Sequence, residues 1–171
     1  MIEYLVFAVI VALAVWLVAI YNLLVRDRNR VAASWSDIDV QLKRRHDLIP
    51  KLVEAVRQYA QFEQSMLDGL TELRTQGAKA DSPAARGSVE SKIGAGIKQL
   101  MLLVEAYPEL KTNQSFLSLQ TNITEVEDHI QYARRFYNGA VRNLNTRIES
   151  FPDILIARLF GYQMAEYFQP D

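Results

Sequence analysis

An uncharged, apolar stretch near the start of the chain constrains its fold more than any other feature. No charged residue occurs from Tyr4 to Val25, and three arginines follow within the next five positions. A helix over this stretch rises roughly 33 Å, which is enough to cross a hydrocarbon core of about 30 Å. We therefore predict a transmembrane anchor over residues 1–25, followed by a single domain over residues 26–171.

The residues that flank this stretch indicate that it is an uncleaved span and suggest its orientation. A signal peptide would begin with positive charge and end at a small-residue cleavage site. Here Glu3 is the only early charge, and the chain leaves the stretch through Tyr21 and Asn22. Positive residues prefer the cytoplasmic side of a membrane, so the arginines after the span favour a cytoplasmic domain over an external one. Those arginines are Arg26, Arg28 and Arg30.

Charge is balanced along the chain, with 19 Lys and Arg against 20 Asp and Glu and a formal net charge of −1. A nucleic-acid-binding domain would carry a basic stripe or patch, so we expect no nucleic-acid partner. The absence of cysteine is compatible with either side of the membrane, because a helical bundle of this size needs no disulfide.

Apolar residues recur at three- and four-residue spacing after the span, which is the pattern of helices with one buried face. The first such seam is interrupted by Arg45 and Glu63 and predicts a helix as far as Thr75, with either a kink or a short break at Pro50. Its apolar members are Trp35, Ile38, Leu42, Ile49, Leu52, Val56, Tyr59, Met66, Leu70 and Leu73.

Three more helices follow the low-hydrophobicity segment from Gln76 to Ser88, which we expect to be the loop. Ser82 before Pro83 is a typical N-cap, and the helix that it begins runs to about Tyr107, where Gly94 and Gly96 either weaken it or admit a neighbouring helix. A long helix is expected from Asn113 to Ser150, with Phe116, Leu119, Ile123, Val126, Ile130, Ala133, Tyr137, Ala140, Leu144 and Ile148 on its seam. A short helix from Asp153 to Phe160 is closed by Gly161. The predicted fold is all-α: an N-terminal transmembrane helix followed by an elongated antiparallel helical bundle.

Two apolar surfaces in this arrangement need a cover. The predicted helices differ in length, so part of the first soluble helix or of the long later helix should expose its seam, and a second copy is the simplest cover. We therefore expect a homo-oligomer. The apolar segment after Pro152 packs against the bundle or a second copy, or alternatively lies on the bilayer surface.

One charged run is the best candidate for a functional patch. The run consists of Asp37, Asp39, Lys43, Arg44, Arg45, His46 and Asp47, of which Asp39, Arg44, Arg45 and Asp47 are the candidate patch residues. Arg45 falls on the apolar seam, where a charge must find a partner. Glu127 and Asp128 of the long later helix are plausible partners. The patch is interpreted as an ion-pair network that fixes the register of the helices, with binding of an anionic group or partner protein, and catalysis, as alternatives.

No residue pattern indicates a metal, a cofactor or a catalytic site. A di-iron bundle uses Glu-x-x-His pairs, whereas the two histidines, His46 and His129, follow Lys43 and Val126 at that spacing. There is no cysteine, no G-x-S-x-G motif and no glycine-rich phosphate loop. We therefore expect a protein that is not an enzyme and binds no cofactor.

Several segments distributed along the chain form a recognisable set of motifs: Tyr21-Asn22, the run from Ser36 to Pro50, Tyr107-Pro108-Glu109-Leu110-Lys111, Leu119-Gln120, the run from Ala133 to Asn138, Phe151-Pro152, and Phe160-Gly161-Tyr162. Over essentially the whole chain, these segments resemble the LemA family of bacterial membrane proteins. The resemblance implies a single N-terminal anchor in a bacterial cell membrane and a helical-bundle domain, but no particular reaction.

This chain departs from the family pattern in two places. Many members look like lipoproteins with a cysteine just before the Tyr-Asn pair, which would hold the domain outside the cytoplasm, whereas this chain has Ala19-Ile20 there. The family also tends to repeat Tyr-Asn one heptad after Asn138, where this chain has Leu144-Asn145.

Together these patterns predict a single-pass membrane protein that acts by self-assembly and protein interaction, as a scaffold or organiser of the cell envelope. Its expected partners are the lipid bilayer, further copies of itself and other membrane proteins. The alternative is a ligand-binding or sensory module that uses the Arg44 and Arg45 patch.

Overall fold

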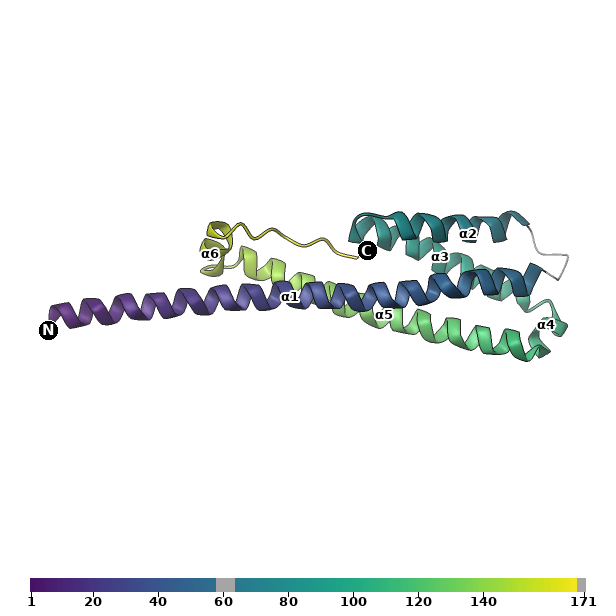
Figure 1. Cartoon of the computed structure of the whole chain (residues 1–171), viewed down its shortest axis with the longest axis horizontal. Helices are drawn as coiled ribbons and strands as arrows, with labels where there is room; N and C mark the ends of the chain where they lie inside the picture. The colour runs from purple at the N-terminus through teal and green to yellow at the C-terminus, as the bar shows by residue number, and fades with distance from the viewer. Residues whose placement is uncertain (58–63, 169–171) are drawn as a thin grey trace. The chain divides into compact units, whose positions relative to one another are not determined.

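The computed structural model describes residues 1–57 and 64–168, which form six helices and no strand (Figure 1). The predicted all-α fold class is therefore confirmed. The helices are α1 (Ile2–Arg57), α2 (Gln64–Lys79), α3 (Pro83–Val104), α4 (Pro108–Thr112), α5 (Gln114–Glu149) and α6 (Asp153–Leu159). They belong to two compact units. Unit 1 comprises Met1–Trp35 and Phe136–Ala165, and unit 2 comprises Ser36–Arg135 and Glu166–Asp171.

Helix α1 contains the apolar stretch at its N-terminal end. It is the one helix among the described residues that is long and apolar enough to cross a membrane. Every residue from Met1 to Ala19 is exposed, and Ile20 is the first buried one. At its other end α1 continues through Pro50 to Arg57, so the alternative of a break at the proline is wrong. The predicted boundary between anchor and domain after residue 25 stays a prediction.

The helix predicted to continue to Thr75 is instead a helical hairpin. Helix α1 ends at Arg57 and α2 is a separate helix, in which Arg74 Nε donates to the backbone carbonyl of His46 at 2.7 Å. Leu67 and Leu70 of α2 join the same core cluster as Leu52 of α1, so α2 runs back along the end of α1. The apolar period could not reveal this reversal, because a straight helix and a hairpin keep the same spacing. Tyr59 and Glu63, two positions of the predicted seam, lie outside the described residues.

The segment predicted as a loop from Gln76 to Ser88 is mostly helical. Helix α2 extends to Lys79 and α3 begins at Pro83, which leaves a connection of three residues. Ser82 is the N-cap of α3, as predicted, and its side chain accepts a hydrogen bond from the backbone N–H of Ala85 at 3.2 Å. The two helices that this connection joins pack against each other (Figure 1).

The later helices follow their predicted bounds closely, with one addition. Helix α3 ends at Val104 rather than Tyr107, and the short α4 after it was not predicted. Helices α5 and α6 lie where the sequence places them. Gly161 ends α6 with a φ of 68°, a left-handed conformation that favours glycine.

Each unit has its own apolar core. In unit 2, helices α1, α2, α3 and α5 contribute fully buried side chains, which include Leu52, Leu67, Leu100 and Phe116. In unit 1, Ile20 and Leu24 of α1 pack with Leu144 and Ile148 of α5 and with Ile156 and Ala157 of α6.

Unit 1 is also held by polar contacts around the end of α5. The side chain of Asn145 bonds both backbone groups of Ala165, at 2.8 and 3.0 Å. Arg147 reaches Asp27 at 2.7 Å and Asp153 at 2.8 Å. These bonds join the end of α5 to α1, to α6 and to the segment that follows α6.

The seam predicted to be exposed is covered within the chain. All described apolar residues of the first seam, and all those of the α5 seam, are buried or partly buried. The prediction of an exposed seam is therefore wrong, because the α2–α3 hairpin covers what a single straight helix would have left open. Self-assembly stays a prediction that must rest on other surfaces.

The core assignment predicts a sharp contrast between two leucines of α3. Leu100 is fully buried, whereas Leu102 is 65% exposed. Leu100→Ala should lower the free energy of unfolding by about 2–5 kcal/mol, because it leaves a cavity in a packed core. Leu102→Ala should change it by less than about 0.5 kcal/mol. Chemical denaturation of the two variants measures the difference, and equal losses would contradict the assigned register of α3.

Candidate functional site: a buried charge cluster in unit 2

Arg45 of α1 is the centre of a buried charge cluster. Its side chain is only 3% exposed and makes bonds to two other helices. Nη1 donates to Glu127 Oε1 of α5 at 2.8 Å, and Nη2 donates to the backbone carbonyl of Glu90 of α3 at 2.9 Å and also to its carboxylate. One guanidinium thus joins three helices, which suits its planar set of five donors.

Glu90 is the most deeply buried acid of the cluster. It is 2% exposed, and its Oε1 lies 2.7 Å from His46 Nε2. Burial by itself would raise the pKa of Glu90, but the hydrogen bond from His46 and the charge of Arg45 together hold that pKa below its ordinary value of 4.5. Since the pKa is lowered on folding, the ionised carboxylate stabilises the folded unit above its unfolded pKa. That contribution is lost as the pH falls through the folded value.

Two glycines lie against the cluster, and at one of them, Gly77, the cluster occupies space that a side chain would need. A Cβ at Gly77 of α2 would lie 2.7 Å from Glu90 Oε1 and 3.3 Å from His46 Nε2. A Cβ at Gly94 of α3 would lie 3.5 Å from Glu127 Oε2 and 3.6 Å from Arg45 Nη1. Gly77 was expected in a loop, and instead it lets α2 approach the Glu90 carboxylate. Of the two glycines predicted to weaken α3 or admit a neighbouring helix, Gly96 is the one that α2 approaches closely, because a Cβ there would lie 3.2 Å from Leu70 Cδ2, whereas the contacts at Gly94 are of ordinary length.

The other predicted patch residues lie at the surface. Asp39 pairs with Lys43 at 2.8 Å and with Arg86 at 2.7 Å. The hydrogen bond from Lys43, with the charge of Arg86, holds the pKa of Asp39 below 3.8 despite partial burial. Arg44 is exposed and contacts Gln41 at 3.4 Å, while Asp47 and Asp128 are exposed. The structure therefore brings Arg45 and Glu127 together and places the remaining four residues outside the buried cluster.

Glu90 is a residue of the cluster that was not predicted from the sequence. It lies in phase with Ile93, Ile97, Leu100 and Val104, all buried positions of α3. An acid at a core position needs a buried cation, and Arg45 interrupts the seam of α1 in the same way. Arg45 and Glu90 each interrupt the apolar seam of a helix, and they carry opposite charges. These two features together could have predicted that the residues form an ion pair.

A groove of about 530 Å³ lies over the cluster between α3 and α5. Arg45, Glu90 and Glu127 line it together with Lys98 and Arg134. Both signs of charge are present, so the lining does not select a charged ligand. Among the residues that the structure describes, no group of three or more His, Cys, Asp or Glu is placed to hold a metal ion. The arrangement is suited to fixing three helices in register rather than to activating a nucleophile.

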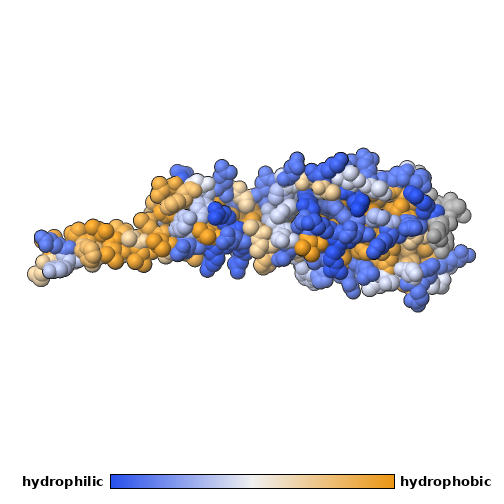
Figure 2. Space-filling model, in the orientation of Figure 1, coloured by the Kyte–Doolittle hydropathy of each residue, from blue (hydrophilic) through white to orange (hydrophobic). Residues whose placement is uncertain are grey.

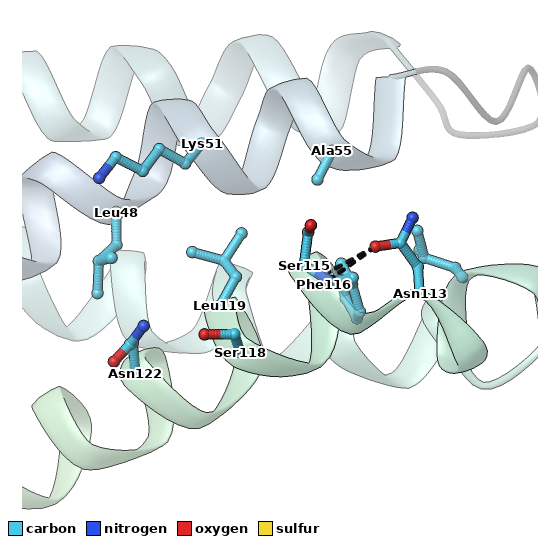
Figure 3. Close-up of a pocket in the computed structure, with 10 residues that line it drawn as sticks. Leu48, Lys51, Ala55, Asn113, Ser115, Phe116, Ser118, Leu119 and Asn122 are labelled. Atoms are coloured by element: carbon cyan, nitrogen blue, oxygen red, sulfur yellow. Dashed lines mark hydrogen bonds between the residues drawn. The ribbon is translucent and has the colours of Figure 1, made fainter.

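A second groove, of about 400 Å³, lies between the end of α1 and the start of α5 (Figure 3). Apolar side chains line it, including Leu48, Ala55 and Leu119, and Ser118 and Asn122 also border it. Lys51 is the only charged residue among the described ones that line it. Polar and apolar residues line it in equal numbers, and the small side chains of Ala55, Ser115 and Ser118 leave room for the backbone of a packed helix or loop.

Comparison with known proteins gives concordant matches over most of the chain. The model of the LemA family matches residues 34–171. A magnetosome protein, MamQ 2 of Paramagnetospirillum magneticum, is 26% identical over 94% of this chain and 68% of its own length. Magnetosome protein MamQ of Magnetospirillum gryphiswaldense is 24% identical over 93% of this chain and 68% of its own length. Protein LemA of Metamycoplasma hominis is 28% identical over 86% of this chain and 68% of its own length. None of these names is that of an enzyme.

The cluster predicts that two neighbouring basic residues differ in their effect on stability. Arg45→Ala should lower the free energy of unfolding by about 3–5 kcal/mol, because it leaves Glu90 buried without its cation. Lys43→Ala removes an exposed i,i+4 pair and should leave stability nearly unchanged. Thermal and chemical denaturation check this, and equal effects would show that Arg45 does not hold the helices together.

The close approach at Gly77 gives a second contrast within one helix. Gly77→Ala should destabilise the protein by about 1–3 kcal/mol, because the carboxylate it would displace is held by both His46 and Arg45. A Cβ at Gly69 would meet nothing within 4 Å, so Gly69→Ala should stabilise α2 by about 0.5–1 kcal/mol. The sign of the two shifts in melting temperature is the readout, and a stabilising Gly77→Ala would contradict the cluster geometry.

Proposed function

Because this chain belongs to the LemA family over residues 34–171, we propose that it acts as a scaffold of the bacterial cell envelope, by self-assembly and protein interaction and without catalytic activity of its own. It is a membrane-associated helical protein with one N-terminal helix suited to span the bilayer. We place the helical domain on the cytoplasmic side, where the arginines after the span favour it.

The observation that carries this proposal is the mutual pairing of the charges in the buried cluster. Arg45, His46, Glu90 and Glu127 bond to one another. These pairings support the fold, and a ligand entering the groove over the cluster would meet charges that already have partners. Because the buried charges hold the helices of the domain in register, we expect the domain to bind its partners through its outer surface.

The ligand-binding alternative has less support. It requires Arg44 and Arg45 to form one basic patch, but Arg45 is buried against Glu90 and Glu127 while Arg44 is exposed beside Gln41. Two adjacent residues of a helix are rotated by about 100° and do not share a face. The pair therefore does not converge on a single anion.

We assign the self-assembly contact to the groove between α1 and α5 (Figure 3). Ser118 and Ala55 are small, so the backbone of a neighbouring helix can approach closely. Leu48 is only partly buried and offers apolar surface for it to bury, while Lys51, Asn113 and Asn122 offer polar groups around it. Membrane anchoring favours this contact further, since it confines copies to two dimensions and raises their effective concentration.

The proposal predicts a defined multimer in native lipid without added ligand. Light scattering and imaging of the gently extracted full-length protein measure the mass. Ser118→Trp fills the groove and should shift the particles toward monomers. Thr121→Trp, on the exposed surface one turn further along α5, is the matched control and should leave the multimer intact.

Three outcomes are distinct in this experiment. A monomeric wild-type protein would contradict self-assembly. A multimer that survives Ser118→Trp would retain self-assembly but overturn the groove as its contact. A multimer lost in both variants would mean that bulk anywhere on α5 is disruptive, which also overturns the assignment to the groove.

A further inference from the structure

The exposed apolar part of α1, residues 1–19, forms a rod that ends at Ile20, and the hydrocarbon core of a bilayer that this rod crosses must end at the same level. Residues 1–19 are all exposed, and Ile20 is the first buried residue at 4% exposure. The helix from Ile2 to Ile20 rises roughly 28 Å, close to the hydrocarbon thickness of about 30 Å. When these residues cross a membrane, its surface lies at the level of Ile20 and Tyr21. Tyrosine is favoured at that depth.

Helix α6 is fixed beside α1 at this same level. Ile156 and Ala157 of α6 share the apolar core cluster of unit 1 with Ile20. The ring of Phe160, directly after α6, lies 4.8 Å from that of Tyr21, centroid to centroid. The position of α6 relative to the end of the span therefore follows from packing within one unit.

The other face of α6 is apolar and uncovered. Phe151, Leu155 and Leu159 recur at four-residue spacing and are 81%, 57% and 75% exposed, with Phe160 also exposed beside them. Figure 2 shows the apolar surface of the rod continuing onto this part of unit 1. Single exposed apolar residues are ordinary, but a cluster next to a membrane span needs an apolar environment.

The charges around this surface suit lipid headgroups. Four exposed arginines of unit 1 lie near the predicted bilayer surface: Arg26, Arg28, Arg30 and Arg158. The guanidinium of Arg28 lies 5.5 Å from the ring centre of Tyr162. The acids Asp27 and Asp153 are both paired with Arg147, and Asp27 also lies 3.6 Å from Arg26. With the exposed Glu149 also counted, the five arginines of this region, Arg147 included, exceed its three acids, and the excess positive charge attracts anionic headgroups.

We propose that Phe151, Leu155, Leu159 and Phe160 form a lipid-docking surface that inserts into the interface of the same bilayer that residues 2–19 cross. The chain then contacts the membrane twice, through the span and through α6. Two fixed contacts set the depth and tilt of unit 1, which a single helix leaves free. This inference rests on the membrane anchoring in the proposed function and is independent of self-assembly.

Site-directed fluorescence tests this surface, because the chain has no cysteine and each label position is therefore unique. Leu155→Cys and Leu159→Cys carry an environment-sensitive label in full-length protein. The protein is reconstituted into vesicles of phosphatidylcholine and phosphatidylglycerol in equal amounts. Quenching is measured with a nitroxide near the headgroup end of the lipid acyl chain, and separately with aqueous iodide.

Two further positions serve as controls. Val9→Cys reports the span, and Asn143→Cys reports an exposed position on α5 of unit 1. We expect lipid quenching at Leu155 and Leu159 to be several-fold greater than at Asn143, with iodide quenching reduced by a similar factor. Circular dichroism of each labelled protein establishes that the helices are retained.

The outcomes separate the inference from its premise. A Val9 label that lipid does not quench would overturn the anchor itself. With Val9 quenched, iodide access at Leu155 and Leu159 would overturn the lipid-docking surface. Protection of both labels from lipid and iodide alike would also overturn it, because a second copy or another protein would then cover α6.

Discussion

A guanidinium at a core position is the constraint on which the rest of unit 2 depends. Burying Arg45 without carboxylates would cost several kcal/mol, so α3 and α5 must each present an acid to it at one height. Glu90 and Glu127 provide these acids. His46 Nε2 forms a hydrogen bond with the carboxylate oxygen of Glu90 that Arg45 does not contact. The approach of α2 is then limited to what Gly77 allows. One side chain thus fixes the register of the helices around it.

A buried network of this kind contributes more to specificity than to stability, since well-packed apolar residues of the same volume often stabilise a fold as well or better. The network prevents α1 from sliding against α3 and α5, because any other register would leave a buried charge without an oppositely charged partner. Unit 1 is built differently. Its polar contacts, Arg147 with two acids and Asn145 with the backbone of Ala165, hold α6 and the following segment beside α1 and leave apolar surface exposed next to the span.

Helices were predictable wherever local pattern and end signals agreed. The long seam of α5, the Ser82 cap and the glycine after α6 gave bounds close to those observed, because each signal acts within a few residues. The hairpin of α1 and α2 was not predictable from spacing, since the apolar period is the same on both sides of a reversal. Glu90 was overlooked because a glutamate in a helix is ordinarily solvated, and only its phase with Ile93 and Ile97 marks it as inward-facing.

The sequence by itself determined that the chain is helical, that its N-terminal helix can span a membrane, and that Arg45 needs buried partners. These properties are local, set by apolar content, by the 3.6-residue period and by the cost of burying charge. Only the tertiary structure decided which acids meet Arg45, at separations of 45 and 82 positions along the chain. It also decided that the seams are covered internally, and that Ile156 packs inward while Leu155 stays exposed. Those choices depend on which helices meet, and the one-dimensional period of a helix does not specify its neighbours.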